Sequence, residues 1–218
     1  MLNLPLNHLY KAADAAAPAP WLLVLMHGVG SNEADLFGLA DFVPPAFHVL
    51  SLRAPYAMAP NMFAWFQFGV NPDGSRTIDA EQERASRALI EQTVQQACAQ
   101  LNVPSNRVVL GGFSQGGIMA LSILLTQPQH MQAAMVWHSR LLPELAGQEA
   151  PVAALTGRAA WVSHGTVDDV IPVSQAHGIR SRLQATPVQL SYREYPCRHE
   201  LHPQELRESM QWLQALAQ

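Results

Sequence analysis

Short apolar segments alternate along this chain with longer amphipathic ones, and this alternation constrains the fold more than any other feature. Such alternation is typical of strands that are buried on both faces and connected by crossover helices. The sequence therefore predicts an α/β protein with a mostly parallel, doubly wound sheet and helices on both faces. The expected strands are residues 21–27, 47–52, 107–113, 133–138, 159–164 and 188–195.

Three further elements are expected. Residues 4–10 are a candidate edge strand. A helix is predicted after Asp79, with Gln82 at the position where a capping box places an amide side chain. Its apolar stripe is Ile90, Val94, Ala97 and Leu101. A second helix has Pro203 in its first turn, and its apolar face is Leu206, Met210, Leu213 and Ala217.

Composition excludes several classes of function. With 218 residues the chain has the size of one domain, residues 1–218. Its formal net charge is −4, so we do not expect the basic surface that nucleic-acid binding needs. No segment is long and apolar enough to cross a bilayer, and polar residues interrupt the amino-terminal leucines before a secretory run develops. Cys98 and Cys197 stand far apart, so we expect no disulfide framework and a cytoplasmic location.

The most informative motif is the Gly-x-Ser-x-Gly pattern of residues 112–116, centred on Ser114. An apolar strand precedes it and an apolar helix follows it, as in a nucleophile elbow, where a sharp turn lifts a serine hydroxyl clear of the sheet. A side chain at Gly112 or Gly116 would collide with backbone in such a turn. The alternative is a glycine-rich turn with an incidental serine.

A serine nucleophile needs a histidine base and a carboxylate that orients it, and in this architecture they follow in the order Ser, acid, His. Asp168 comes just after a predicted strand and is the preferred acid, with Asp169 as the competitor. His199 lies in the loop after the last strand and is the preferred base. His202 directly precedes Pro203, which favours a role in starting the helix.

An oxyanion hole of two backbone N–H groups is the usual partner of such a nucleophile. One donor is expected from Gln115, which follows the serine, and the other from Val29, in the glycine-rich loop after the first strong strand. His138 ends a predicted strand at the same rim and is a candidate pocket residue. A metal site at Cys197, His199 and His202 is disfavoured because no second ligand pair accompanies it.

These residues together resemble the phospholipase/carboxylesterase family, which includes acyl-protein thioesterases and bacterial carboxylesterases. The resemblance spans nearly the whole chain and rests on residues 26–30, 53–55, 64–66, 111–117, 164–172 and 195–199. It implies the α/β-hydrolase fold, hydrolysis of esters or thioesters through an acyl-enzyme, no metal or organic cofactor, and frequent homodimers. It also implies Ser114, Asp168 and His199 as the triad, with the amides of Val29 and Gln115 as the oxyanion hole.

The pocket departs from the usual pattern of that family at Arg198, at residues 138–140 and at residues 58–62. Too few residues separate Ser114 from Asp168 to hold a large lid, so we expect an open site for short to medium acyl esters. An apolar cluster is expected to line the acyl groove, or else to belong to the core: Met58, Met62, Phe63, Trp65 and Phe66. The alternatives are an acyl thioesterase or lysophospholipase, and a non-catalytic binding module on the same scaffold.

Overall fold

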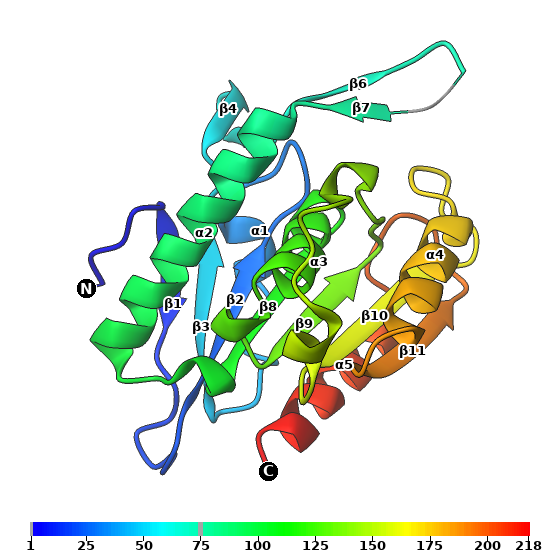
Figure 1. The fold of residues 1–218 in the computed structure, drawn as a ribbon. Coiled ribbons are helices and arrows are strands. Elements are labelled where there is room, and N and C mark those ends of the chain that lie inside the picture. The colour runs from blue at the N-terminus through cyan, green and yellow to red at the C-terminus, as the bar shows by residue number, and fades with distance from the viewer. Residues whose placement is uncertain (1, 74–75) are drawn as a thin grey trace.

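The computed structural model describes residues 2–73 and 76–218, and its centre is a seven-stranded sheet in the order β1-β3-β2-β8-β9-β10-β11 (Figure 1). All neighbouring strands are parallel except β1, which runs antiparallel to β3 at one edge. The predicted α/β class and mostly parallel sheet are confirmed. The strands are β1 (His8–Lys11), β2 (Trp21–Met26), β3 (Phe47–Leu52), β8 (Val108–Phe113), β9 (Ala133–Trp137), β10 (Ala159–Gly165) and β11 (Gln189–Tyr195).

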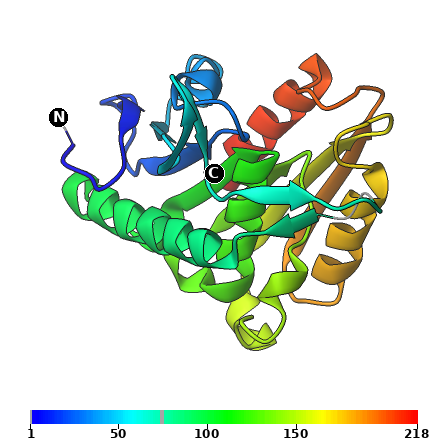
Figure 2. The same ribbon diagram turned by 90° about the horizontal axis from the view of Figure 1, so that it is seen from above.

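Helices cover both faces of this sheet, as predicted (Figures 1 and 2). On one face α2, α3 and α4 bury Ile90, Ile118 and Ile179 in one apolar core, and on the other α1 and α5 bury Leu36 and Leu213 in a second core. The helices are α1 (Ala34–Phe37), α2 (Ala80–Leu101), α3 (Gln115–Thr126), α4 (Val173–Gln184) and α5 (Pro203–Leu216). Short 3₁₀ helices are η1 (Ser105–Arg107), η2 (Pro128–His130), η3 (Pro143–Leu145) and η4 (Val152–Leu155). None of the helices in the described ranges is long and apolar enough to span a membrane.

The two predicted helix starts are correct in position, but one differs in its capping. Asp79 caps α2 by accepting the backbone N–H groups of Glu81 and Gln82. The predicted capping box is wrong, because the Gln82 side chain instead accepts the N–H of Gln67. His202 caps α5, whose capping box is complete.

Two hairpins between β3 and α2 were not predicted. The first pairs β4 (Tyr56–Ala59) with β5 (Met62–Ala64), and the second pairs β6 (Phe68–Val70) with β7 (Arg76–Ile78). The second hairpin projects beyond the carboxyl ends of the central strands (Figure 1). These short strands carry too little alternation to stand out from an apolar cluster.

Candidate active site

Ser114 occupies a strained turn between β8 and α3. Its φ of 53° and ψ of −115° lie in a region that residues with a Cβ rarely adopt. A Cβ at Gly112 would lie 2.3 Å from the carbonyl carbon of Gly116, and a Cβ at Gly116 would lie 1.9 Å from the carbonyl oxygen of Met26. Both glycines are therefore sterically required for the turn, as the sequence predicts.

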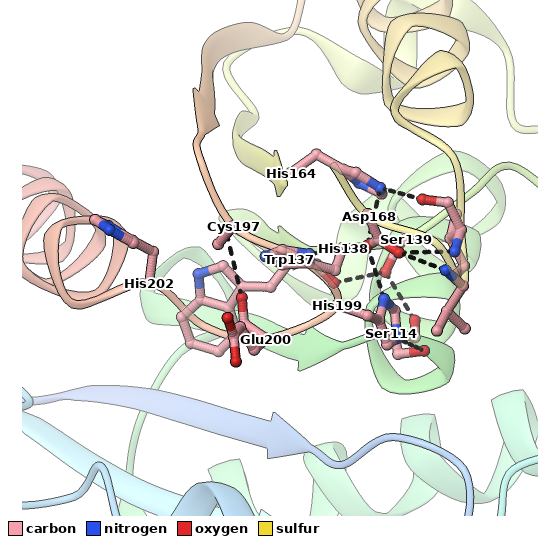
Figure 3. Close-up of polar contacts among 12 residues, drawn as sticks. Ser114, Trp137, His138, Ser139, His164, Asp168, Cys197, His199, Glu200 and His202 are labelled. Carbon is pink, nitrogen blue, oxygen red and sulfur yellow. Dashed lines mark hydrogen bonds and ion pairs between the residues drawn. The ribbon is translucent and has the colours of Figure 1, made fainter. Parts of the chain in front are cut away.

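His199 bridges Ser114 and Asp168 at the carboxyl ends of the strands (Figure 3). Its Nε2 lies 2.9 Å from Ser114 Oγ and its Nδ1 lies 2.7 Å from Asp168 Oδ2. An ionised carboxylate only accepts hydrogen bonds, so Nδ1 carries the proton and the lone pair of Nε2 faces the serine hydroxyl. The three side chains thus have the arrangement in which a histidine can take a proton from a serine.

The structure also distinguishes Asp168 from Asp169, the competitor for the role of the acid. The Asp168 side chain is fully buried, and its Oδ1 accepts the N–H groups of Val170 and Ile171 at 2.9 and 2.8 Å. Burial alone would raise the pKa of Asp168, but hydrogen bonds from His199, Ile171 and the further histidine His138 outweigh it and lower that pKa. Asp169 instead points to the surface and pairs with Arg198.

Two more buried histidines converge on the same carboxylate. His138 Nδ1 lies 3.0 Å from Asp168 Oδ2, while its Nε2 lies 3.2 Å from Glu205 Oε2 on α5. His164 Nε2 donates to the carbonyl oxygen of Ile171 at 2.7 Å and lies 3.3 Å from Asp168 Oδ2. The prediction that His138 is a pocket residue is wrong, because it lies behind the acid and not on the cavity wall.

His138 has the contacts of a buried imidazolium ion. Each of its ring nitrogens faces a carboxylate oxygen, so both nitrogens donate when Asp168 and Glu205 are ionised. Burial opposes the charge on the ring, but the hydrogen bonds and charges of Glu205 and Asp168 outweigh it and raise the pKa of His138. By contrast, burial lowers the pKa of His164. The surroundings therefore favour the charged form of His138 and the neutral form of His164.

The loop expected to supply an oxyanion donor is fixed by His27. Its Nε2 accepts the N–H of Ala54 at 3.1 Å, so its Nδ1 carries the proton and donates to the carbonyl oxygen of Gly28 at 2.7 Å. Val29 follows directly and lines the same cavity as Ser114 and Gln115. Neither Val29 N–H nor Gln115 N–H has an acceptor among residues 2–73 and 76–218. Both amides are therefore available to a bound group.

The cavity beside Ser114 has a volume of about 180 Å³ and mostly apolar walls formed by Phe66, Phe68, Phe113 and Ile118. Two arginines complete its wall: Arg76 from β7 and Arg140 from the loop after β9. From the sequence, Arg140 stood out only as part of a departure from a family pattern, and Arg76 was not predicted to be a site residue.

Of the five residues predicted for the acyl groove, only Phe66 lines this cavity. Met58 and Met62 are exposed on the first hairpin. Phe63 lies under the guanidinium of Arg53, and Trp65 is buried with its Nε1 bonded to the carbonyl oxygen of His27. The Gln115 side chain fixes this segment by bonding the backbone of both Trp65 and Phe66.

The buried cluster also contains two groups of potential metal ligands, His138 with Cys197 and Glu205, and His138 with His164 and Asp168. His138 already shares hydrogen bonds with Asp168 and Glu205, and His164 donates to the carbonyl oxygen of Ile171. Burial raises the pKa of the Cys197 thiol to about 11, which disfavours the thiolate that a metal needs. The three residues considered as a metal site from the sequence, Cys197, His199 and His202, have different surroundings: His199 faces Ser114 and His202 caps α5.

A parallel sheet, a strained serine turn and a histidine between that serine and a buried acid define the α/β-hydrolase class. The family model described as Phospholipase/Carboxylesterase matches residues 10–217, and the chain belongs to this family. It is accordingly an esterase or thioesterase, a serine hydrolase that acts on ester bonds.

Individual relatives are distant but nearly full-length. Acyl-protein thioesterase 1 of Eremothecium gossypii is 24% identical and is matched over 94% of this chain and 92% of its own length. The structure of the Bacillus cereus carboxylesterase is 22% identical, with a TM-score of 0.83 over 97% of this chain and 94% of the other. Esterase PE8 is 23% identical, with a TM-score of 0.81 over 97% and 99%. The two structural matches support the fold.

Proposed function

We propose that this protein is a carboxylesterase that hydrolyses short- to medium-chain carboxylic esters, with Ser114 as nucleophile, His199 as base and Asp168 as the orienting acid. The observation that carries the proposal is the continuous series of hydrogen bonds from Ser114 Oγ through His199 to Asp168, at 2.9 and 2.7 Å. A non-catalytic scaffold has no need of this series, which argues against a binding module.

In the proposed reaction, His199 takes the proton of Ser114 as the hydroxyl attacks the ester carbonyl. The negative charge that develops on the carbonyl oxygen is stabilised by the N–H groups of Val29 and Gln115. His199 then gives its proton to the departing alcohol, which leaves an acyl-enzyme. Water hydrolyses this intermediate by the same proton transfers in reverse. Asp168 keeps His199 in the required tautomer and stabilises its charged form.

The chain length of the acyl group follows from the cavity. About 180 Å³ with apolar walls suits a short acyl chain better than a long one. The name of the Eremothecium gossypii relative makes acyl thioesters the second candidate substrate. A lysophospholipid would need room for a long acyl chain, which this cavity does not offer. A cytoplasmic location and homodimer formation stay predictions from the sequence.

A fluorophosphonate probe tests the nucleophile directly. We expect the wild-type protein and the exposed-serine control Ser105→Ala to be labelled equally, and Ser114→Ala not to be labelled. The Ser114→Ala variant is also expected to lose esterase activity by roughly 10⁴-fold or more. Labelling that persists without Ser114 would overturn the assignment. A series of nitrophenyl esters and acyl thioesters then ranks the substrates, and a maximum at long acyl chains would contradict the proposed chain length.

A further inference from the structure

Two arginines face the cavity of the proposed nucleophile, and neither pairs with a carboxylate in the part of the chain that the structure describes. Arg140 makes one long hydrogen bond, of 3.4 Å, to the carbonyl oxygen of Leu141. Arg76 donates to the carbonyl oxygen of Val170 at 2.8 Å and lies 5.4 Å above the ring of Phe68. In the described ranges neither guanidinium forms an ion pair.

Five of the other ten arginines have carboxylate partners: Arg53 with Glu33, Arg87 with Glu83, Arg182 with Glu149, Arg193 with Glu208 and Arg198 with Asp169. The remaining five also form no ion pair within the described ranges, but none of them lines the cavity: Arg84, Arg107, Arg158, Arg180 and Arg207. Acidic residues are in excess over the whole chain, with 17 Asp and Glu against 13 Lys and Arg. Two unneutralised guanidinium groups at one cavity therefore do not follow from a general surplus of positive charge.

Burial makes the charge of Arg140 unfavourable in the absence of an anion. Burial lowers the pKa of Arg140, the carboxylate of Glu144 partly restores it, and the nearby charge of Arg76 lowers it again. Glu144 acts only at a distance, because its Oε2 has no hydrogen-bond partner among the described residues. An anion between the two guanidinium groups would relieve their repulsion and accept further, charge-assisted hydrogen bonds from both.

We propose that Arg76 and Arg140 bind a carboxylate at the far end of the acyl group, so that the preferred substrates are half-esters of short dicarboxylic acids. The inference rests on the proposed function and names its substrate class. The acyl side is favoured because apolar walls suit methylene groups, and because about 180 Å³ leaves no room for a large anionic alcohol such as a nucleotide. Arg76 and Arg140 also border a neighbouring hollow of about 570 Å³, so the carboxylate would stay partly hydrated.

The test compares esters that differ only in the terminal charge. The 4-nitrophenyl half-ester of glutaric acid carries a carboxylate, and its methyl ester is the neutral counterpart. We expect the wild-type kcat/KM to be at least about tenfold higher for the charged ester, and the ratio to fall at high ionic strength. Arg140→Gln and Arg76→Gln are each expected to reduce this ratio by roughly tenfold while neutral-ester activity persists. Arg84→Gln, an exposed change of the same charge on α2, is the matched control and leaves the ratio unchanged.

Several results would overturn the inference while leaving the esterase proposal intact. One is equal kcat/KM for the two esters in a wild type whose activity depends on Ser114. Another is a charge preference that Arg140→Gln and Arg76→Gln do not alter. A third is a stronger preference for a phosphate on the alcohol side. If no ester is hydrolysed, calorimetric binding of monomethyl glutarate to wild type and to Arg140→Gln still decides whether the arginines bind a carboxylate.

Discussion

Replacing His138 with glutamine tests the interpretation of the buried cluster behind the acid. The His138 side chain is fully buried and holds two carboxylates, at 3.0 Å from Asp168 and 3.2 Å from Glu205. A glutamine amide is neutral, so two buried carboxylates would then lack the cation that compensates them. Removing one member of a buried charge cluster costs about 3–5 kcal/mol. In a protein of this size that corresponds to a fall in Tm of roughly 6–20 °C.

Urea unfolding of four variants separates this loss from ordinary effects of substitution: His138→Gln, Glu205→Gln, the two combined, and His177→Gln. His177→Gln is the matched control, because His177 also pairs with a carboxylate, Glu194, but with its side chain 44% exposed. Such a surface pair contributes about 0–1 kcal/mol. Glu205→Gln combined with His138→Gln replaces the charged pair by two amides, and we expect part of the stability to return as a coupling of at least about 1 kcal/mol. If His138→Gln were no more destabilising than His177→Gln, the buried imidazolium would be refuted.

Three further outcomes are expected. The kcat/KM for a neutral ester falls as the pH is lowered, because His199 must be unprotonated to act as base; a pH profile that stays flat speaks against this role. The folded-state pKa of His138 is raised, so its contribution to stability is complete below the ordinary histidine pKa and is lost as pH rises through the raised value. Urea midpoints measured across that range would fall in the wild type, and an equal fall in His138→Gln would contradict the assignment. Gly116→Ala abolishes folding or the serine turn, as judged by circular dichroism and probe labelling, because its Cβ would lie 1.9 Å from the carbonyl oxygen of Met26.

The central strands were predictable because strands buried on both faces leave continuous apolar runs in the sequence. The six predicted strands agree with β2, β3, β8, β9, β10 and β11 to within one residue at each end. The central position expected for the last of them is wrong, because β11 lies at an edge of the sheet and only Tyr195 in it is buried. The residues that meet at the site were predictable for a related reason. A parallel sheet brings the ends of its strands to one edge, and Ser114, Asp168 and His199 each follow such an end.

The cluster behind the acid could not be predicted in the same way. The contact between His138 and Glu205 joins residues 67 positions apart, and no motif links them. The only sequence signal was that Glu205 stands three residues after His202, where a capping box places a carboxylate. The capping box explains why Glu205 Oε2 accepts the His202 N–H, but it does not indicate that the same oxygen faces His138.

The cavity wall was missed because it depends on the path of a loop and a hairpin. Arg76 reaches the site from β7, and its neighbours in sequence gave no periodic pattern that would orient it. The apolar cluster of residues 58–66 was expected to line the groove or to belong to the core, and its composition does not tell which face of a hairpin turns inward. Met58 and Met62 accordingly lie on the outer side, while Phe66 and the later Phe68 line the cavity.

The site is held to the sheet by hydrogen bonds that continue past the ends of the strands. The N–H of Ser114 donates to the carbonyl oxygen of Trp137, and the N–H of His138 donates to that of Ser163, each at 2.9 Å. Both donors have a positive φ, of 53° and 50°. The chain therefore leaves β8 and β9 by the same kind of sharp turn, one directing Ser114 to the cavity and the other directing His138 behind Asp168. Because strand register fixes both turns, a shift of one residue in β9 would displace the nucleophile and the cluster that supports its acid together.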